Sequence, residues 1–263
     1  MIWLPLLFAL PALFEGTDPA GYTRVSPPGV QYRMNMATAT RAPWVDSNIW
    51  QYRRDPVKKY LCDVRKGPVA LAMAEAFSQG VDAQMWIDPA QKPAYEKMLE
   101  FLKSLPDGPK SRWVDFAVTD DGSAEAGEAL KLLSRRNLMY GPRGGLALKL
   151  TKAIADPYEF MLDAREKLGD EKRVLRLYGS EMTIADIYRD GGRVRLHLIQ
   201  YGERGVEGLR LRVRGKYPQA TAKAYLFGVP EATLTDYVVE GGFTEFSLPK
   251  LGSYGVIDLT EGK

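Results

Sequence analysis

Four aspartates stand where short apolar runs of the sequence give way to turns, and carboxylates at such points can do chemistry. They are Asp63, Asp88, Asp120 and Asp121. Ligands of open parallel sheets bind beyond the carboxyl ends of the strands, and these residues would lie at such ends. A carboxylate there can hold a divalent cation, bind sugar hydroxyls or act in an acid–base pair. Asp88, Asp120 and Asp121 are therefore candidate catalytic residues, and Asp63 is a candidate ligand-binding residue.

Asp120 and Asp121 also have a structural explanation. Gly122 and Ser123 follow them and lead into a helix-like run. Asp and Ser are preferred N-cap residues, and a negative charge complements the helix dipole at that position. The sequence leaves both explanations open.

A second group of candidates lies in the stretch 44–54, which has the composition of a loop. Trp44, Asp46, Asn48 and Trp50 are candidate ligand-binding residues there. Indole rings offer stacking area to a sugar, and amide and carboxylate groups hydrogen-bond to its hydroxyls. Alternatively, the aromatic residues fill space and seal the edge of a sheet.

A single cysteine, Cys62, and a single histidine, His197, remove several classes of chemistry. The chain cannot form an intramolecular disulfide or a Cys/His zinc cluster. A Cys–His or Ser–His–Asp mechanism would need His197 as its base, but this residue lies in an alternating run that is typical of a strand. Cys62 lies in another strand-like run, which predicts a buried, inert thiol. We therefore expect no thiol- or histidine-dependent catalysis, no bound metal and no cofactor.

Composition is that of an ordinary globular protein, with 45% hydrophobic and 26% charged residues. The net charge of +3 is too small to indicate nucleic-acid binding. Arg210, Arg212 and Arg214 alternate with apolar residues, which predicts the solvated outer face of a strand rather than a surface for an anionic polysaccharide. Two further carboxylates, Glu181 and Glu245, have no visible partner in the sequence.

Strand-like and helix-like segments alternate up to about residue 170. Strands are expected near 59–64, 83–88, 113–118, 137–140 and 146–150, and helices near 68–77, 89–102, 125–136 and 156–168. Short loops between such units predict a parallel sheet covered by helices. There are too few units for a closed eight-stranded barrel, so we predict an open, mostly parallel, flavodoxin-like sheet.

From about residue 173 the sequence is typical of strands and tight turns. Asp190-Gly191-Gly192 and Glu240-Gly241-Gly242 are hairpin signals, and the regular spacing of short strands predicts an antiparallel β-sandwich. The predicted organisation is an export signal at 1–16, an irregular lead-in at 17–43, an α/β domain at 44–170 and a β-sandwich domain at 171–263.

The uncharged apolar segment 1–14 has the length of a signal-peptide core, and Leu10-Pro11-Ala12 resembles a cleavage site. The alternative is an N-terminal segment buried in the core. The segment is too short to span a bilayer, so membrane contact is expected only during export. The predicted location is secreted or periplasmic, and the sequence predicts no oligomeric state.

Three segments, 173–181, 191–202 and 243–259, resemble the C-terminal β-sandwich of multidomain glycoside hydrolases of the β-galactosidase type. The preceding part is similar to the flavodoxin-like, glutamine-amidotransferase-like module found beside such sandwiches. The amidotransferase triad is not matched, because Cys62 lacks the Gly-x-Cys-x-Gly elbow and His197 lies in the β part. The resemblance therefore implies an accessory architecture without the chemistry of the family.

The leading functional hypothesis is an exported carbohydrate-associated accessory or binding protein. One alternative is a glycoside-hydrolase-like enzyme that uses carboxylates such as Asp88, Asp120 and Asp121. Another is a structural or protein-interaction module. An acidic pair that converges with Trp44 and Trp50 in one pocket would favour the enzyme, whereas a broad apolar patch on the sandwich would favour the interaction module.

Overall fold

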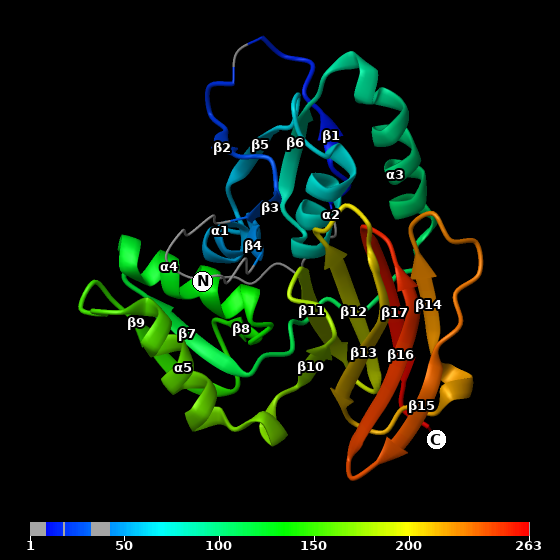
Figure 1. Ribbon diagram of the computed structural model, residues 1–263. Coiled ribbons are helices and arrows are strands. Elements are labelled where there is room, and N and C mark those ends of the chain that lie inside the picture. The colour runs from blue at the N-terminus through cyan, green and yellow to red at the C-terminus, as the bar shows by residue number, and fades with distance from the viewer. Residues whose placement is uncertain (1–8, 18, 33–42, 263) are drawn as a thin grey trace.

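The computed structural model of the protein describes residues 9–17, 19–32 and 43–262. Figure 1 shows an N-terminal part of helices and parallel strands beside a C-terminal part of long antiparallel strands. The first parallel sheet has the order β1–β6–β5–β2, with bounds Ala12–Leu13, Asp82–Trp86, Lys59–Asp63 and Thr23–Val25. The second has the order β8–β7–β9, with bounds Tyr140–Gly141, Phe116–Asp120 and Leu146–Leu150.

This arrangement differs from the single open flavodoxin-like sheet that the sequence predicted. The parallel strands divide between two sheets, and a separate antiparallel hairpin pairs β3 (Gly29–Tyr32) with β4 (Pro43–Asp46). Two edge strands of the first sheet, β1 and β2, come from the segments predicted as export signal and irregular lead-in. Strands of two and three residues carry no periodicity, so only their pairing with longer strands reveals them.

The helices lie in the N-terminal part and carry ordinary capping signals. Their bounds are Ile49–Arg54 for α1, Val69–Gln79 for α2, Lys92–Ser104 for α3, Ala124–Arg135 for α4 and Pro157–Leu168 for α5. Asp156 caps α5 by accepting a bond from the Tyr158 N–H at 2.8 Å, and Gly80 ends α2 in the left-handed conformation. No helix in the described ranges is long and apolar enough to cross a membrane.

The C-terminal part consists of two four-stranded antiparallel sheets. One has the order β10–β13–β16–β15, with bounds Leu175–Tyr178, Val206–Arg214, Phe243–Leu251 and Thr235–Glu240. The other has the order β11–β12–β17–β14, with bounds Thr183–Asp190, Arg193–Gln200, Tyr254–Thr260 and Lys223–Leu226. Both predicted hairpins are confirmed, because Gly191 and Gly241 connect their strands with positive φ angles of 58°.

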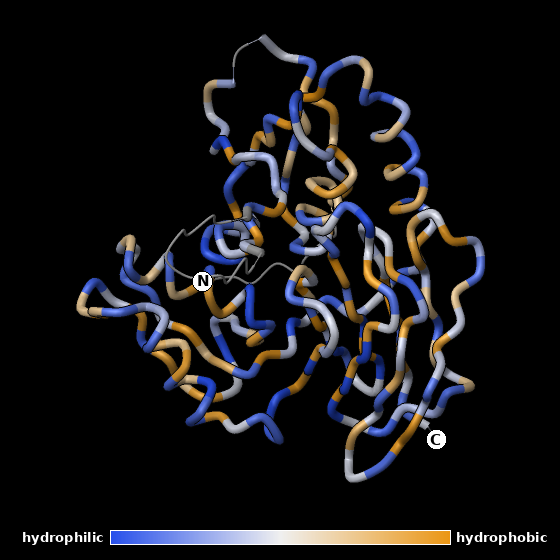
Figure 2. The backbone as a smooth tube through the Cα atoms, viewed as in Figure 1, coloured by the Kyte–Doolittle hydropathy of each residue, from blue (hydrophilic) through white to orange (hydrophobic). Residues whose placement is uncertain are grey.

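One apolar core lies between the two antiparallel sheets, as expected for a β-sandwich. Leu196 from β12 and Ile257 from β17 pack in it with Leu211 from β13 and Phe246 from β16. Along the strands of this part, hydrophobic and hydrophilic stretches alternate (Figure 2). The alternation matches the burial of β13, where buried and partly exposed residues alternate, whereas β12 is buried along all but its first residue.

A second core joins the two parts of the molecule. Met73 and Phe77 of α2 belong to the same cluster as Ile199 of β12 and Val256 of β17. The sheet β11–β12–β17–β14 is thus covered on both faces, by the other sheet on one side and by α2 on the other. Figure 1 shows α2 above the ends of β11 and β12.

Candidate functional site on β4, α1 and α4

The stretch predicted as a loop is a strand followed by a short helix, so that prediction is wrong. Trp44 lies on β4 and Trp50 on α1. Ser47 Oγ accepts a bond from the first N–H of α1 at 3.2 Å, and the Asn48 carbonyl accepts the N–H of Tyr52 at 3.1 Å. Short polar side chains start the helix in this way, and burial of Tyr52 fixes it to the core.

Cationic side chains of α4 lie beside the first tryptophan. The Arg135 guanidinium carbon is 3.3 Å from the centroid of the Trp44 ring, and Lys131 Nζ is 5.4 Å from it. Lys131 Nζ also lies 4.0 Å from Asp46 Oδ1. Trp44 and Trp50 are both partly buried against the core of α4 and α5. Each ring therefore has one side that packs inward and another that faces polar groups or solvent.

Arg54, at the end of α1, connects Trp50 with Asp120. Its Nε lies 2.6 Å from Asp120 Oδ2 and its Nη2 lies 2.7 Å from Oδ1, while its guanidinium carbon is 5.9 Å from the Trp50 ring centroid. Gly127 of α4 permits this approach, because a Cβ there would lie 3.2 Å from both side chains. The Asp120 carboxylate is thus held in a bidentate ion pair.

Asp121 is held by backbone groups. It accepts bonds from the Ser123 N–H at 2.9 Å and the Lys152 N–H at 2.8 Å. Hydrogen bonds from Ser123 and Lys152 lower the pKa of Asp121 to about 2. A carboxylate with so low a pKa does not donate a proton near neutral pH. Its contacts are those of a turn before a helix.

Asp63 and Asp88 lie at the other parallel sheet. Asp63 ends β5, and its carboxylate pairs with Arg65 Nε at 2.8 Å and Nη2 at 2.6 Å. The Arg65 guanidinium carbon lies 3.8 Å from the Trp86 ring centroid. Asp88 is exposed and accepts a backbone N–H of the following 3₁₀ turn at 2.8 Å. The four candidate aspartates therefore do not follow one sheet, because the predicted sheet is divided in two.

Asn48 points into the protein, where it meets a carboxylate that the sequence analysis did not single out. Glu75 of α2 is fully buried. Its carboxylate accepts bonds from the Asn48 side-chain amide at 3.2 Å and from the Tyr201 hydroxyl at 2.5 Å. Burial raises the pKa of Glu75 to about 7, although bonds from Tyr201, Ser47 and Asn48 offset part of the rise.

A second buried carboxylate lies near the end of α2. Asp186 of β11 is paired with Arg53 and with Arg112, whose Nη1 is 2.6 Å from Oδ1. Gln79, one turn beyond Glu75 on α2, also donates to Asp186, and its Oε1 accepts from Arg112 Nη2 at 3.0 Å. We call Glu75, Gln79, Asp186, Tyr201, Arg53 and Arg112 the polar seam, because they join the two parts of the molecule.

The sequence does contain a signal for the polar seam. Glu75 interrupts the apolar run of α2, and Asp186 interrupts that of β11. A charged residue within a run that is otherwise buried needs a partner, because an unpaired buried charge is costly. The identity of the partner is not encoded locally, since Tyr201 is 126 residues from Glu75.

The predicted burial of Cys62 is confirmed, and His197, which was predicted only as an ordinary strand residue, lies on β12 and is fully buried as well. Tyr52 Oη lies 3.1 Å from Cys62 Sγ, and burial raises the pKa of the Cys62 thiol to about 12. His197 Nδ1 lies 2.6 Å from the Tyr254 hydroxyl, and burial lowers the pKa of the imidazole. These environments disfavour both a reactive thiolate and a charged imidazole.

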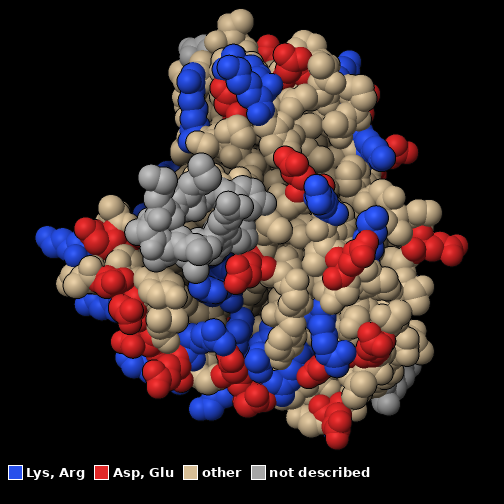
Figure 3. Space-filling view, in the orientation of Figure 1, with Lys and Arg blue, Asp and Glu red and all other residues tan. Residues whose placement is uncertain are grey.

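Glu245 has partners that the sequence did not reveal. On β16 its carboxylate lies 2.8 Å from Arg210 Nη2 and 3.3 Å from Arg212 Nε, both on β13. Figure 3 shows red and blue side chains interleaved over the lower part of the molecule. The outer face of this sheet is therefore of mixed charge. No group of three or more His, Cys, Asp or Glu side chains in the described ranges is placed to hold a metal ion.

No protein-family model matches the sequence, and no curated protein matches it. Among solved structures, the fold is similar to that of α-L-fucosidase isoenzyme 2 from Paenibacillus thiaminolyticus, with a TM-score of 0.60 and 8% identity. That likeness covers 82% of this chain and 62% of the fucosidase, which is less than two thirds of its length.

Two other solved structures are more distant. A rhamnosidase from Novosphingobium sp. PP1Y is 16% identical, with a TM-score of 0.29 over 78% of this chain and 17% of its own. An α-amylase from Geobacillus thermoleovorans is 10% identical, with a TM-score of 0.21 over 82% of this chain and 62% of its own. Only the fucosidase likeness carries weight, and it concerns the fold alone. By that likeness, the chain has a fold similar to that of this fucosidase over most of its length.

Proposed function

We propose that the protein is a carbohydrate-binding or accessory module that acts without acid–base chemistry at its predicted aspartates. The observation that carries the proposal is that Asp120 and Asp121 are held by Arg54 and by backbone N–H groups, while Trp50, near the start of α4, and Trp44, near its end, are partly exposed. Binding a saccharide by stacking and hydrogen bonding needs no free acid. The fold likeness to a fucosidase supports carbohydrate as the ligand class.

A glycan array tests this proposal. Trp44→Ala is expected to weaken binding roughly tenfold, because stacking on an indole contributes on the order of 1 kcal/mol. Trp86→Ala is the matched control, since Trp86 is also a partly buried indole beneath a guanidinium but lies on β6 of the first parallel sheet. Trp50→Ala and Asp120→Asn extend the test across the same face.

Two results would contradict the proposal. One is equal loss of binding in Trp44→Ala and Trp86→Ala. The other is a wild-type protein that binds no glycan across a broad panel. Thermal unfolding of each variant must accompany the array, because Trp44 and Trp50 also pack against the core of α4 and α5.

A second candidate function, a glycosidase-like hydrolase, is favoured by one further observation. Burial raises the pKa of Glu75 to about 7, the range in which a carboxyl group serves as a general acid, although the side chain is fully buried and a substrate would reach it only through an opening of the polar seam. The neighbour of similar fold is named for hydrolysis of α-L-fucosides. Turnover of an aryl α-L-fucoside by the wild type, abolished in Glu75→Gln while the fold survives, would establish this function over the first. Absence of turnover would remove it.

Export is a further proposal, and it rests on the apolar segment 1–14. Intact-mass measurement of protein from an exporting host is expected to show loss of residues 1 to about 12. Retention of Met1 would contradict it.

A further inference from the structure

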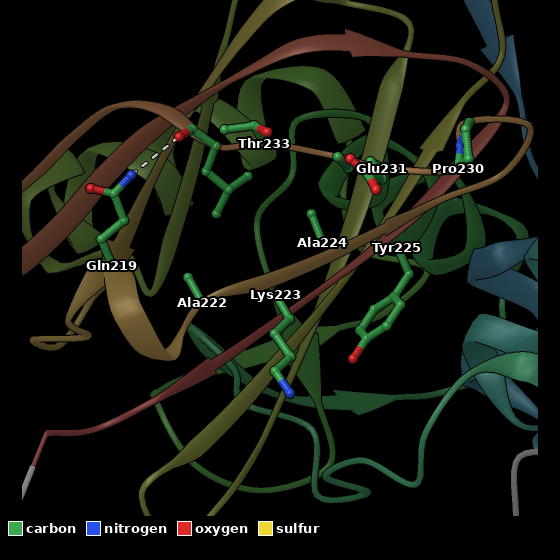
Figure 4. Close-up of a pocket in the computed structure, with 10 residues that line it drawn as sticks. Gln219, Ala222, Lys223, Ala224, Tyr225, Pro230, Glu231 and Thr233 are labelled. Carbon is green, nitrogen blue, oxygen red and sulfur yellow. Dashed lines mark hydrogen bonds between the residues drawn. The ribbon is translucent and has the colours of Figure 1, made fainter.

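A cavity of about 480 Å³ lies in the C-terminal part, on different elements from the β4–α1–α4 face. Figure 4 shows it between edge strand β14 and the segment Pro230–Leu234 that runs toward β15. Its size is within the range of small-molecule sites. The turn in which the Val229 N–H bonds to the Leu226 carbonyl leads into this segment at one end, and Gln219 donates to the Leu234 carbonyl at 3.4 Å at the other.

The strand register turns backbone groups toward this cavity. β14 pairs with β17, with Tyr225 opposite Val256 and Ala224 opposite Ile257. The Phe227 N–H bonds to the Tyr254 carbonyl at 3.0 Å, so the odd-numbered residues of β14 bond to β17. In an antiparallel pair the alternate residues direct their N–H and C=O outward. Ala224 therefore presents one backbone donor and one acceptor at the cavity wall.

A single free backbone pair is too little for an added strand. Strand addition needs a row of unpaired groups along an open edge, whereas here the segment Pro230–Leu234 closes the far side. The short stretch of free edge favours a small ligand over an extended peptide.

The side chains of the wall combine apolar and polar groups. In Figure 4 the methyl groups of Ala222 and Ala224 project toward the segment Pro230–Leu234, and Lys223 and Tyr225 project from the opposite face of β14. Glu231 supplies a carboxylate at the cavity, whereas Lys223 lines it with its ammonium group directed away from the segment Pro230–Leu234. A carboxylate at the wall disfavours an anionic ligand and accepts hydrogen bonds from hydroxyl groups.

We infer that this cavity binds one ring of a neutral saccharide. A pyranose has an apolar face for the alanine methyl groups and hydroxyls for Glu231, Thr233 and the backbone of Ala224. The inference rests on the proposed carbohydrate function and adds a second binding site to it. The second site lies in the C-terminal part, whereas Trp44 and Trp50 of the first site lie in the N-terminal part.

Saturation-transfer NMR and calorimetry with methyl glycosides of neutral hexoses test the inference, with methyl glucuronide as the anionic probe and methyl glucosaminide as the cationic one. Millimolar binding of a neutral glycoside is expected. Glu231→Gln and Thr233→Val should each weaken it roughly tenfold, the effect of losing a hydrogen bond to a charged or hydroxyl group. Ala224→Leu should abolish binding by filling the cavity.

Two substitutions on β15 are matched controls. Glu240→Gln and Thr235→Val make the same chemical changes at exposed residues that do not line the cavity, and they should leave binding unchanged. Binding lost in Trp44→Ala but retained in Glu231→Gln, Thr233→Val and Ala224→Leu would overturn the cavity while leaving the proposed function intact. Binding of the charged probes alone would overturn the neutral class, and binding of no probe or glycan would overturn both proposals.

Discussion

Two neighbouring arginines on α1 form ion pairs in different environments. The side chains of Arg53 and Asp186 in the polar seam are 4% and 2% exposed, whereas those of Arg54 and Asp120 on the β4–α1–α4 face are 18% and 17% exposed. The chemical groups are the same, but water screens only the second pair. Removing one partner is therefore expected to have very different costs. The comparison shows that residue type alone does not identify a functional site.

The largest effect is expected for Asp186→Ala. This substitution leaves the guanidinium groups of Arg53 and Arg112 buried beside each other without their carboxylate. Breaking a buried pair costs about 3–5 kcal/mol of the free energy of unfolding. Urea denaturation measures the loss, and the double variant Asp186→Ala/Arg53→Ala should recover part of it. If Asp186→Ala lost less of the free energy of unfolding than Asp120→Ala, the comparison of the two ion pairs would be contradicted.

The next effect is a pH dependence carried by Glu75. The pKa of this residue is raised from 4.5 to about 7 in the folded protein, so between these values the folded state keeps a proton that the unfolded state releases. The free energy of unfolding should therefore fall by roughly 3 kcal/mol as pH rises through this window, and should not change further above it.

Glu75→Gln tests this dependence, because an amide cannot titrate. Urea denaturation from pH 5 to pH 8 should give a shallower decline in the variant than in the wild type. Asp121, whose pKa of about 2 lies below the window, provides the control variant Asp121→Asn, which should keep the slope of the wild type. If the free energy of unfolding fell with pH equally in the wild type and in Glu75→Gln, the carboxylate of Glu75 would not be the source of the pH dependence.

The smallest effect is expected for Asp120→Asn. Partly exposed ion pairs contribute about 0–1 kcal/mol, and asparagine still accepts the Gly122 N–H that Asp120 now accepts at 2.8 Å. In thermal unfolding, the melting temperature of the variant should lie close to that of the wild type, and the difference between the two should decrease further at high salt. A salt-independent loss of several kcal/mol would mean that this pair behaves like the one in the polar seam.

Local signals in the sequence were sufficient for part of the fold. Asp156 before Pro157 predicted the start of α5, and Asp190-Gly191-Gly192 predicted the β11–β12 hairpin, because capping and turn geometry depend on adjacent residues. The division of the parallel strands into two sheets depends on packing between distant segments, which periodicity does not report. For the same reason β1 and β2 were missed.

The candidate site was predictable to a smaller extent. The sequence identified Trp44 and Asn48 as members of one group, but the structure turns Trp44 toward α4 and Asn48 toward Glu75. Which side each residue faces was hidden because β4 and α1 were taken for a loop. Glu75 and Asp186 were overlooked because their partners lie far along the chain.

The polar seam also has a consequence for synthesis of the chain on the ribosome. Arg53 is 133 residues from Asp186, and Glu75 is 126 residues from Tyr201. The charged groups of α1 and α2 therefore leave the ribosome long before the strands that neutralise them exist. Until β11 and β12 are made, the nascent N-terminal segment has polar groups that it cannot bury at low cost. We expect the completed N-terminal part to wait in an open, chaperone-accessible state, and to close only when the strands of the C-terminal part arrive.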